Sequence, residues 1–249
     1  MAWSTSSSTP QQTHEVFLSF RGEDTRYNFT SHLHATLTRL EVGTYIDYNL
    51  QRGDEISSSL LRAIEEAQLS VVVFSKNYGN SKWCLDELVK ILECKKMKGQ
   101  IVLPIFYDIE ASHVRNQTGS YEEAFVKHEE RFQGNLAKVQ KWREALREAA
   151  NLSGWVCSVN RMESELLEKI ANDVIEKLNR VYVGDLDHKI AKLEQLATLQ
   201  YQFYNKVAGL ENVNKYNATV RRITELKMER SMRLFRLSPE SGHALKGKS

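Results

Sequence analysis

Two Arg-Gly pairs have the chemistry of a phosphate-binding site. They are Arg21-Gly22, directly after the apolar run 15–20, and Arg52-Gly53, in the segment 49–54 that follows the next apolar run. Arginine recognises phosphate through its planar guanidinium, and glycine lets a backbone approach a ligand closely. Two such loops on one rim therefore suit a molecule that carries a pyrophosphate. For Arg52-Gly53, a simple exposed turn is an equally good interpretation from the residues alone.

A tryptophan and a glutamate form the second candidate group, in the run SKWCLDEL. If a helix begins near Lys82, then Trp83 and Glu87 are four residues apart and share one of its faces. A flat aromatic ring would then lie beside a carboxylate. Spacing alone favours a plainer interpretation, in which the tryptophan is a partly buried packing residue and the glutamate is a solvated helix acid.

The elements that must position these residues alternate between short apolar runs and amphipathic helices. Strands are expected at 15–20, 44–47, 69–75 and 101–107, with a short edge strand at 152–155. Helices are expected at 29–40, 56–67, 82–92, 135–150 and 163–178. This order predicts an α/β domain with a doubly wound parallel sheet and helices on both faces. In such a sheet ligands bind beyond the carboxyl ends of the strands, where both candidate groups lie.

The character of the sequence changes after Gly184. Residues 185–249 carry 12 basic and 7 acidic side chains, a net charge of +5, which leaves −3 for the rest of a chain whose formal charge is +2. This part lacks strand-like runs and predicts helices at 186–207 and 218–236 before a polar tail. We expect three parts: a disordered N-terminus at 1–13, the α/β domain at 14–183 and a basic helical extension at 184–249.

Several function classes are excluded by what the sequence lacks. It contains neither G-x-G-x-x-G nor G-x-x-x-x-G-K-[ST], so a Rossmann dinucleotide site and a P-loop have no support. Three cysteines without a C-x-x-C pair or a histidine at ligand spacing argue against disulfides and against a metal site. The longest apolar run, at 101–107, is far shorter than the ~18 residues of a membrane span. With no secretory signal, the expected compartment is the cytosol or the nucleus.

Four long runs, in order, resemble the plant Toll/interleukin receptor (TIR) domain. They are HEVFLSFRGEDTRYNFTSHL, YIDYNLQRGDEISSSLLRAIEEA, VVVFSKNYGNSKWCLDELVKIL and IVLPIFYDIEASHVRNQTGSYEEAF. The resemblance covers residues 14 to about 157. It implies a flavodoxin-like fold with a central five-stranded parallel sheet, and it implies an immune-signalling module of a kind that often cleaves NAD+ after self-association.

The resemblance also assigns roles to individual residues. Glu87 matches the catalytic glutamate of the family, and NAD+ or NADP+ would be its substrate rather than a cofactor. The substrate-binding residues that the resemblance implies are Phe20, Arg21, Gly22, Glu23, Asp24, Thr25, Arg26, Arg52, Gly53, Ile56, Ser75, Trp83 and Cys84. In these roles Arg21 and Arg26 hold phosphates and Trp83 offers a stacking surface. The segment with Arg52 and Gly53 matches the BB loop, which helps to close the site of a neighbouring molecule in active assemblies.

Two surfaces of self-association follow from the same resemblance. Ser31 and His32 match the family's Ser-His pair on the first helix, away from the apolar stripe of that helix. The stretch 111–119 and the helix around Trp142 correspond to a second surface, although Trp142 itself is expected in the core. The sequence departs from the family here, because Glu110-Ala111 stand where Asp-Pro is usual, and the missing proline is expected to free this loop.

Two functions stay open at this point. One is an NAD+ hydrolase or cyclase that produces nucleotide signals in a plant immune pathway. The other is a non-enzymatic adaptor that joins TIR assemblies. The expected partners are further copies of the chain and other TIR-containing immune receptors. Binding to a membrane is not expected. Nucleic-acid binding by the basic helix at 220–236 is a weaker alternative, since its charges suit a solvated face and only Phe235 interrupts them. At 249 residues the chain resembles a TIR-only protein or a TIR domain with an extension.

Overall fold

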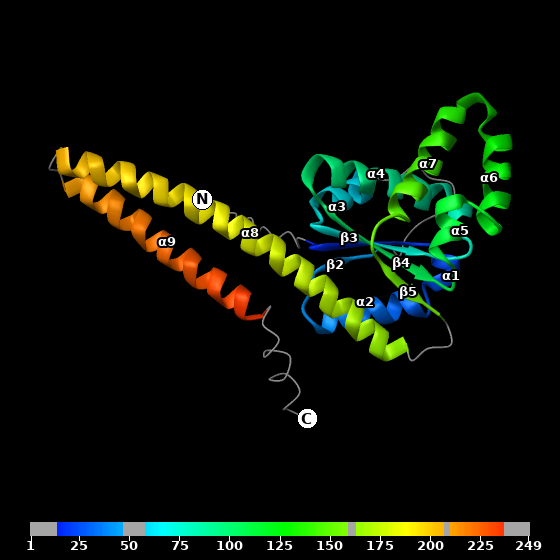
Figure 1. Cartoon of the computed structure of the whole chain (residues 1–249), viewed down its shortest axis with the longest axis horizontal. Helices are drawn as coiled ribbons and strands as arrows, with labels where there is room; N and C mark the ends of the chain where they lie inside the picture. The colour runs from blue at the N-terminus through cyan, green and yellow to red at the C-terminus, as the bar shows by residue number, and fades with distance from the viewer. Residues whose placement is uncertain (1–13, 47–57, 159–162, 207–209, 237–249) are drawn as a thin grey trace, which may run out of the picture. The chain divides into compact units, whose positions relative to one another are not determined.

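A five-stranded parallel sheet forms the centre of the fold. The structure is a computed structural model that describes residues 14–46, 58–158, 163–206 and 210–236 (Figure 1). The strands are β1 (Val16–Phe20), β2 (Thr44–Tyr45), β3 (Leu69–Phe74), β4 (Ile101–Tyr107) and β5 (Trp155–Cys157). They pair in the order β2-β1-β3-β4-β5, and every pair is parallel. The predicted fold class is therefore confirmed.

Helices cover both faces of this sheet, as the alternating pattern predicts. They are α1 (Gly22–Thr25), α2 (Phe29–Arg39), α3 (Ser58–Glu66), η1 (Tyr78–Asn80), α4 (Lys82–Lys98), α5 (Ala111–Asn116), α6 (Ser120–Arg131), η2 (Gln133–Asn135), α7 (Leu136–Ala149), α8 (Glu163–Lys206) and α9 (Leu210–Arg236). The helices α3, α4 and α7 lie on one face, and α2 and the first part of α8 lie on the other (Figure 1).

The central strand β3 shows why this sequence forms a parallel sheet. All six of its residues are buried, and the strand pairs with β1 on one side and with β4 on the other. A strand covered on both faces needs apolar side chains on both, so it is a continuous apolar run rather than an alternating one. Each of these two strands contains one buried serine, Ser70 in β3 and Ser19 in β1. Ser19 lies on the same face as Phe17, two positions earlier, and Phe17 packs in the cluster formed with α3 and α4.

Some elements differ from the prediction. The stretch expected to be freed by the missing proline begins a helix at Ala111, and a second helix follows it, α6, which the pattern did not indicate. Alanine has the highest helix propensity, so a helix forms there without proline. The edge strand begins at Trp155 rather than at residue 152. Gly154, just before it, approaches β4 so closely that a Cβ on it would lie 2.2 Å from the carbonyl oxygen of Pro104. Asp47 and residues 56–57 lie outside the described ranges.

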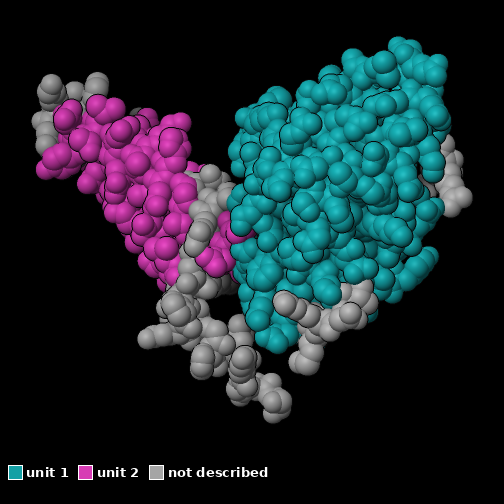
Figure 2. All heavy atoms as spheres, turned by 45° about the vertical axis from the view of Figure 1, so that its right-hand side comes forward, with its two compact units in different colours: residues 1–174 teal, residues 175–249 magenta. Residues whose placement is uncertain are grey.

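The chain divides into two compact units, residues 1–174 and 175–249 (Figure 2). The prediction of two separate helices, 163–178 and 186–207, is wrong, because α8 runs unbroken through Gly184. A single glycine in a helix costs only ~1 kcal/mol relative to alanine, and α8 contains no proline that would break it. The expected boundary at 183/184 stays a prediction.

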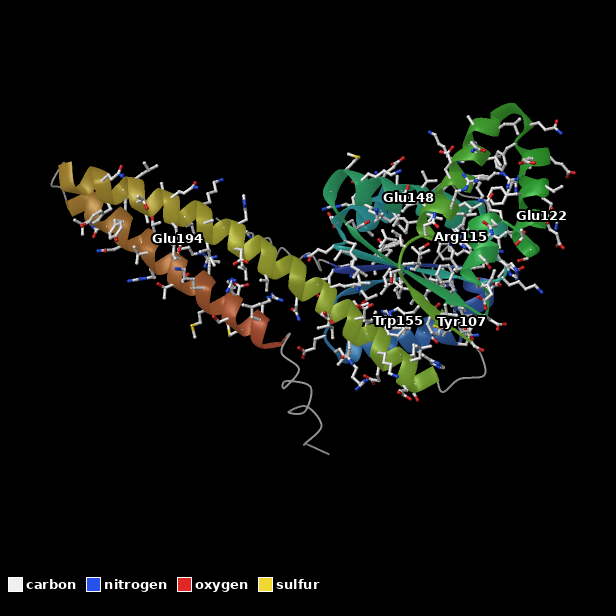
Figure 3. The ribbon with its side chains drawn as sticks, viewed as in Figure 1. Tyr107, Arg115, Glu122, Glu148, Trp155 and Glu194 are labelled. Atoms are coloured by element: carbon white, nitrogen blue, oxygen red, sulfur yellow. The ribbon has the colours of Figure 1, made fainter. Side chains whose placement is uncertain are left out.

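Within the second unit, α8 packs against α9 as a helical pair. Leu186 and Ile190 on α8 share a buried seam with Ile223 and Leu226 on α9. Glu194 of α8 forms an ion pair with the Lys227 ammonium of α9, with 2.7 Å between the nitrogen and oxygen atoms (Figure 3). Throughout the described part of the chain, each helix is either too short or too polar to serve as a membrane span.

Candidate active site at the carboxyl ends of strands β1 and β3

Helix α4 carries the Trp83–Glu87 pair, and its caps fix its position. The Ser81 hydroxyl accepts a hydrogen bond from the Cys84 amide at 3.3 Å, and Gly99 ends the helix in the left-handed region with a φ of 70°. The apolar stripe of this helix packs on the sheet. Glu87 lies on the same buried side and is only 3% exposed. The interpretation of Glu87 as a solvated helix acid is therefore wrong.

Two hydroxyl groups lie next to the Glu87 carboxylate. The Ser19 Oγ donates a hydrogen bond to Glu87 Oε2 at 2.7 Å and lies 3.0 Å from the Tyr78 Oη. The Tyr78 hydroxyl in turn donates to the backbone carbonyl oxygen of Cys84 at 2.9 Å. All of these side chains are buried, and burial raises the pKa of Tyr78 well above its ordinary value, so the phenol keeps its proton. The carboxylate is thus held at the carboxyl end of β1.

Two arginines follow β1 around the short helix α1. The Arg21 Nη2 donates to Glu23 at 2.6 Å, while its buried Nε has no hydrogen-bond partner among the described residues. The guanidinium of Arg26 lies over the ring of Phe20, 5.7 Å from its centroid. Gly22 is where α1 begins, and a Cβ there would meet the Arg26 guanidinium at 2.7 Å. These residues form one local group next to the strand that carries Ser19.

Asp24 of α1 connects this group to the end of β3 through hydrogen bonds. The Asp24 carboxylate accepts hydrogen bonds from the Ser75 Oγ at 2.6 Å and from the Asn77 amide at 2.9 Å. Thr25 is buried and accepts a hydrogen bond from the Thr30 hydroxyl at 2.8 Å. Asp24, Thr25 and Ser75 therefore hold the rim of the site together through contacts within the protein.

The remaining predicted substrate-binding residues differ in how far they are buried and in whether the structure describes them. Cys84 is buried against the Phe20 carbonyl oxygen at 3.5 Å, and burial raises the pKa of its thiol to about 12, so it is not a nucleophile at neutral pH. Trp83 is half-buried, with the Lys82 ammonium 5.8 Å from the centroid of its ring. The residues predicted from the BB loop, Arg52, Gly53 and Ile56, lie outside the described ranges.

Ser19 and Tyr78 are the members of this site that the sequence analysis did not select. A serine inside an otherwise apolar strand is the available indication for Ser19, because strand alternation puts it on the face that α4 covers. No comparable indication exists for Tyr78, since its contact depends on how the short helix η1 turns the chain after β3.

The acid next to Glu87 in the sequence faces a different part of the fold. The Asp86 carboxylate accepts hydrogen bonds from the Trp142 indole at 2.8 Å and from the Lys138 ammonium at 3.0 Å. These three side chains line part of a hollow of about 270 Å³ between α4 and α7, and a larger hollow of about 690 Å³ lies at α6 and α7. Neither hollow is lined by a predicted substrate-binding residue. The described residues contain no group of three or more side chains arranged to hold a metal ion.

The predicted self-association residues lie on α2, apart from this site. His32 is exposed, while the Ser31 hydroxyl donates to the Asn28 carbonyl oxygen at 2.8 Å in the first turn. The apolar stripe of α2 is fully buried and turned to the sheet. Trp142 is 1% exposed, which confirms its predicted place in the core.

Fold and site together define a flavodoxin-like α/β domain whose candidate ligand site lies at the carboxyl ends of parallel strands, between β1 and β3, where the strand order reverses. A family model described as the TIR domain matches residues 13–193, which is more than half of the chain. The chain therefore belongs to the TIR domain family.

Several plant proteins are similar to this chain. Disease resistance protein RPV1 of Vitis rotundifolia is 53% identical over 187 residues, which cover 73% of the chain and 13% of that protein. TMV resistance protein N of Nicotiana glutinosa is 43% identical over 198 residues, which cover 77% of the chain and 17% of that protein. The chain thus spans less than a fifth of the length of either relative.

One solved structure is similar in both fold and sequence. It is the TIR domain portion of the activated Roq1 resistosome, which directly recognises the pathogen effector XopQ. The match has a TM-score of 0.58 and 46% sequence identity, and it covers 65% of this chain and 99% of that one.

Proposed function

We propose that this TIR domain is an NAD+ hydrolase or cyclase of a plant immune pathway, activated by self-association. It releases nicotinamide and ADP-ribose-type nucleotides. The observation that carries the proposal is the buried carboxylate of Glu87 at the carboxyl end of β1, where Ser19 donates a hydrogen bond to it. The similarity to disease resistance proteins supports the immune role.

A single carboxylate is sufficient for this reaction. Most glycosidases need two carboxyl groups, since one of them must protonate a poor leaving group. The nicotinamide of NAD+ is already cationic, so the bond between its nitrogen and C1′ of the ribose breaks with the electron pair moving to the ring, which leaves neutral. Glu87 stabilises the positive charge that develops on the ribose. Water, or a ribose oxygen in the cyclase route, then bonds to C1′ and gives its proton to Glu87.

The groups around β1 suit the rest of the substrate. The Nε of Arg21 is a buried donor without a hydrogen-bond partner among the described residues, and a phosphate oxygen is a strong acceptor for it. Arg26 supplies a second guanidinium near the same strand. The half-buried ring of Trp83 offers a surface on which a base can stack. Arg52, Gly53 and Ile56 stay predictions for the apolar and closing side.

Dependence on assembly is part of the proposal. The loop with Arg52-Gly53 would complete the site of a neighbouring copy, so turnover should rise with the degree of association. The Roq1 relative, whose TIR domains were solved in an activated resistosome, supports assembly as the active state. The exposed His32 and its neighbour Ser31 are the proposed contact on α2.

The test compares matched variants on one helix. Concentrated protein is incubated with NAD+, and nicotinamide is measured for the wild type, Glu87→Ala and the control Glu93→Ala, whose side chain is exposed on α4. We expect release by the wild type and by the control but not by Glu87→Ala. Equally low release by all three proteins, with association shown by light scattering, would refute the enzymatic role.

A contact adaptor is the second candidate, favoured by the exposed position of His32 on a helix whose apolar side is fully buried. An adaptor would keep its association and its downstream effect in Glu87→Ala and would lose both in His32→Ala. The enzyme would lose its effect in each variant.

A further inference from the structure

The hydrogen bonds around Glu87 outnumber the hydroxyl hydrogens that are available to form them. Three contacts run in series from Glu87 Oε2 through the Ser19 Oγ and the Tyr78 Oη to the Cys84 carbonyl oxygen, at 2.7, 3.0 and 2.9 Å. Each hydroxyl group has one hydrogen to donate, and the Cys84 carbonyl oxygen can only accept a hydrogen bond. With an ionised carboxylate at the other end, two hydrogens serve three contacts, so one contact lacks a hydrogen.

A proton on Glu87 supplies the missing hydrogen. The carboxyl then donates to the Ser19 Oγ, the Ser19 hydroxyl turns to donate to Tyr78, and the Tyr78 hydroxyl donates to the Cys84 carbonyl oxygen. When the proton leaves, the Ser19 hydroxyl turns back and donates to the carboxylate. No covalent O–H bond of the serine or the tyrosine breaks in either direction, because only the hydroxyl torsions change.

We propose that Ser19 and Tyr78 form a reversible hydroxyl relay that holds the Glu87 carboxyl in one position in both of its protonation states. They are positioning residues, since both are fully buried and act through Glu87. The inference rests on the proposed function for its role in the reaction. There Glu87 takes a proton from the attacking water and later gives it to solvent, and the relay keeps the carboxyl in place throughout.

Within the described ranges, the charged and titratable groups around the relay come from three parts of the fold. Arg21 and Asp24 approach from the segment after β1, Cys84 from α4 and Tyr121 from α6. Burial raises the pKa values of Cys84 and Tyr121, so both stay neutral near pH 7 and neither competes with Glu87 for a proton. Arg21 donates a hydrogen bond to Glu23, and Asp24 accepts hydrogen bonds from Ser75 and Asn77.

Two single-hydroxyl deletions should move the titration of Glu87 in opposite directions. Tyr78→Phe leaves the Ser19 hydroxyl without an acceptor whenever Glu87 donates to it, so the protonated form is weakened and the titration midpoint falls. Ser19→Ala removes a hydrogen bond to the carboxylate, and bonds to a charged group are the stronger kind, so the midpoint rises. Each change should be about 0.5 to 1 pH unit. Altered packing alone gives no reason for opposite signs.

The midpoint is measured without any turnover. The full chain is labelled with ¹³C at the glutamate carboxyl carbons, and the Glu87 resonance is the one that Glu87→Gln removes. Matched controls are Tyr121→Phe, which deletes a buried hydroxyl that donates to the Ser75 carbonyl oxygen, and Ser70→Ala, which deletes a buried hydroxyl on β3. Both controls should leave the midpoint unchanged. Equal midpoints in all five proteins, or movement of both test variants in one direction, would overturn the relay.

Turnover is the second readout and separates the relay from the proposed function. In Ser19→Ala and Tyr78→Phe we expect kcat for nicotinamide release to fall about tenfold with KM little changed, since neither side chain touches the substrate. Midpoints that move in opposite directions in a protein that releases no nicotinamide would refute the enzyme and support the relay. Normal kcat in both variants of an active enzyme would overturn the positioning role.

Discussion

Asp86 and Glu87 are neighbouring acids on helix α4, and their side chains have different kinds of hydrogen-bond partner. Asp86 points to α7, where its partners are the Trp142 indole and the Lys138 ammonium. Glu87 lies on the buried side of α4, where the Ser19 hydroxyl is one of its partners. Both are largely shielded, with the Asp86 side chain 15% exposed and Glu87 3% exposed. Burial therefore does not distinguish the two acids.

The type of partner does distinguish them. An indole N–H and an ammonium group only donate, so both bind the Asp86 oxygens as acceptors. A hydroxyl both donates and accepts, so it suits a carboxylate that gains and loses a proton. Asp86 therefore joins α4 to α7, whereas the hydroxyl beside Glu87 is compatible with the catalytic role that we propose for this carboxylate.

The largest effect expected from this comparison is on turnover. Glu87→Gln should lower kcat for nicotinamide release by about 10²- to 10⁴-fold, because an amide cannot take the proton of the attacking water. Asp86→Asn makes the same acid-to-amide change one residue away, and its kcat should stay within about threefold of the wild-type value. Release assays on both variants check this. A folded Asp86→Asn protein that is as inactive as Glu87→Gln would contradict the division.

The second effect is on stability and concerns Asp86. Asp86→Ala should lower the free energy of unfolding by about 1–3 kcal/mol, because the buried Trp142 N–H loses its acceptor. Urea denaturation gives the value. The double variant Asp86→Ala/Trp142→Phe has no orphaned N–H, so it should lose less than the sum of the two single variants. Simple additivity would mean that this hydrogen bond contributes little.

A third effect depends on pH and concerns His128 of α6, which packs against Trp142, the partner of Asp86. The ring of His128 lies 5.1 Å from the ring of Trp142, and its Nε2 is 2.9 Å from the Gly79 carbonyl oxygen. Burial lowers the pKa of His128, which means that the fold favours the neutral ring. Its contribution to stability is present above the ordinary pKa of about 6.5 and is lost as the pH falls through the lower folded value.

Unfolding free energies measured from pH 7.5 to 5 should therefore decrease less in His128→Gln than in the wild type. His113→Gln is the matched control, since that side chain is exposed on α5. The same pH slope in all three proteins would show that His128 does not titrate with unfolding.

The smallest effect belongs to the charged partner of Asp86. The Lys138 side chain is 32% exposed, so its ion pair with Asp86 is partly screened by water. Lys138→Met should lower the free energy of unfolding by less than about 1 kcal/mol, and the difference should shrink as salt is added. Thermal melts at low and high ionic strength measure it. A larger loss that is insensitive to salt would mean that packing of the lysine stem matters more than its charge.

The sequence predicted the parallel sheet well because buried parallel strands are almost continuous apolar runs, as in Leu69–Phe74, where Ser70 is the one polar residue. It missed α6, whose exposed face is rich in charge and whose buried residues are few and spread among polar ones, such as Tyr121, Phe125 and His128. It also placed a break near Gly184, where α8 continues, because a composition change and a glycine do not by themselves end a helix.

The candidate site was predictable only in part. Helical spacing brought Trp83 and Glu87 to one helix, yet it did not show that Glu87 is buried, since that depends on how α4 crosses the end of β1. The partnership of Ser19 with Tyr78 joins residues 59 positions apart and depends on the turn at η1. Asp24, Thr25 and Ser75 stay predicted substrate-binding residues, and the sequence did not show their hydrogen bonds within the protein, between Asp24 and Ser75 and between Thr25 and Thr30.

The burial of all three cysteines has a practical consequence for labelling. Cys84, Cys94 and Cys157 are each 3% exposed or less, and burial raises the pKa values of the Cys84 and Cys94 thiols. Maleimide dyes react with accessible thiolates, so the native protein should take up almost no label while it is folded. A cysteine introduced at exposed Tyr27 would then be a single fluorescent reporter, ready to follow assembly by energy transfer without removing any native thiol.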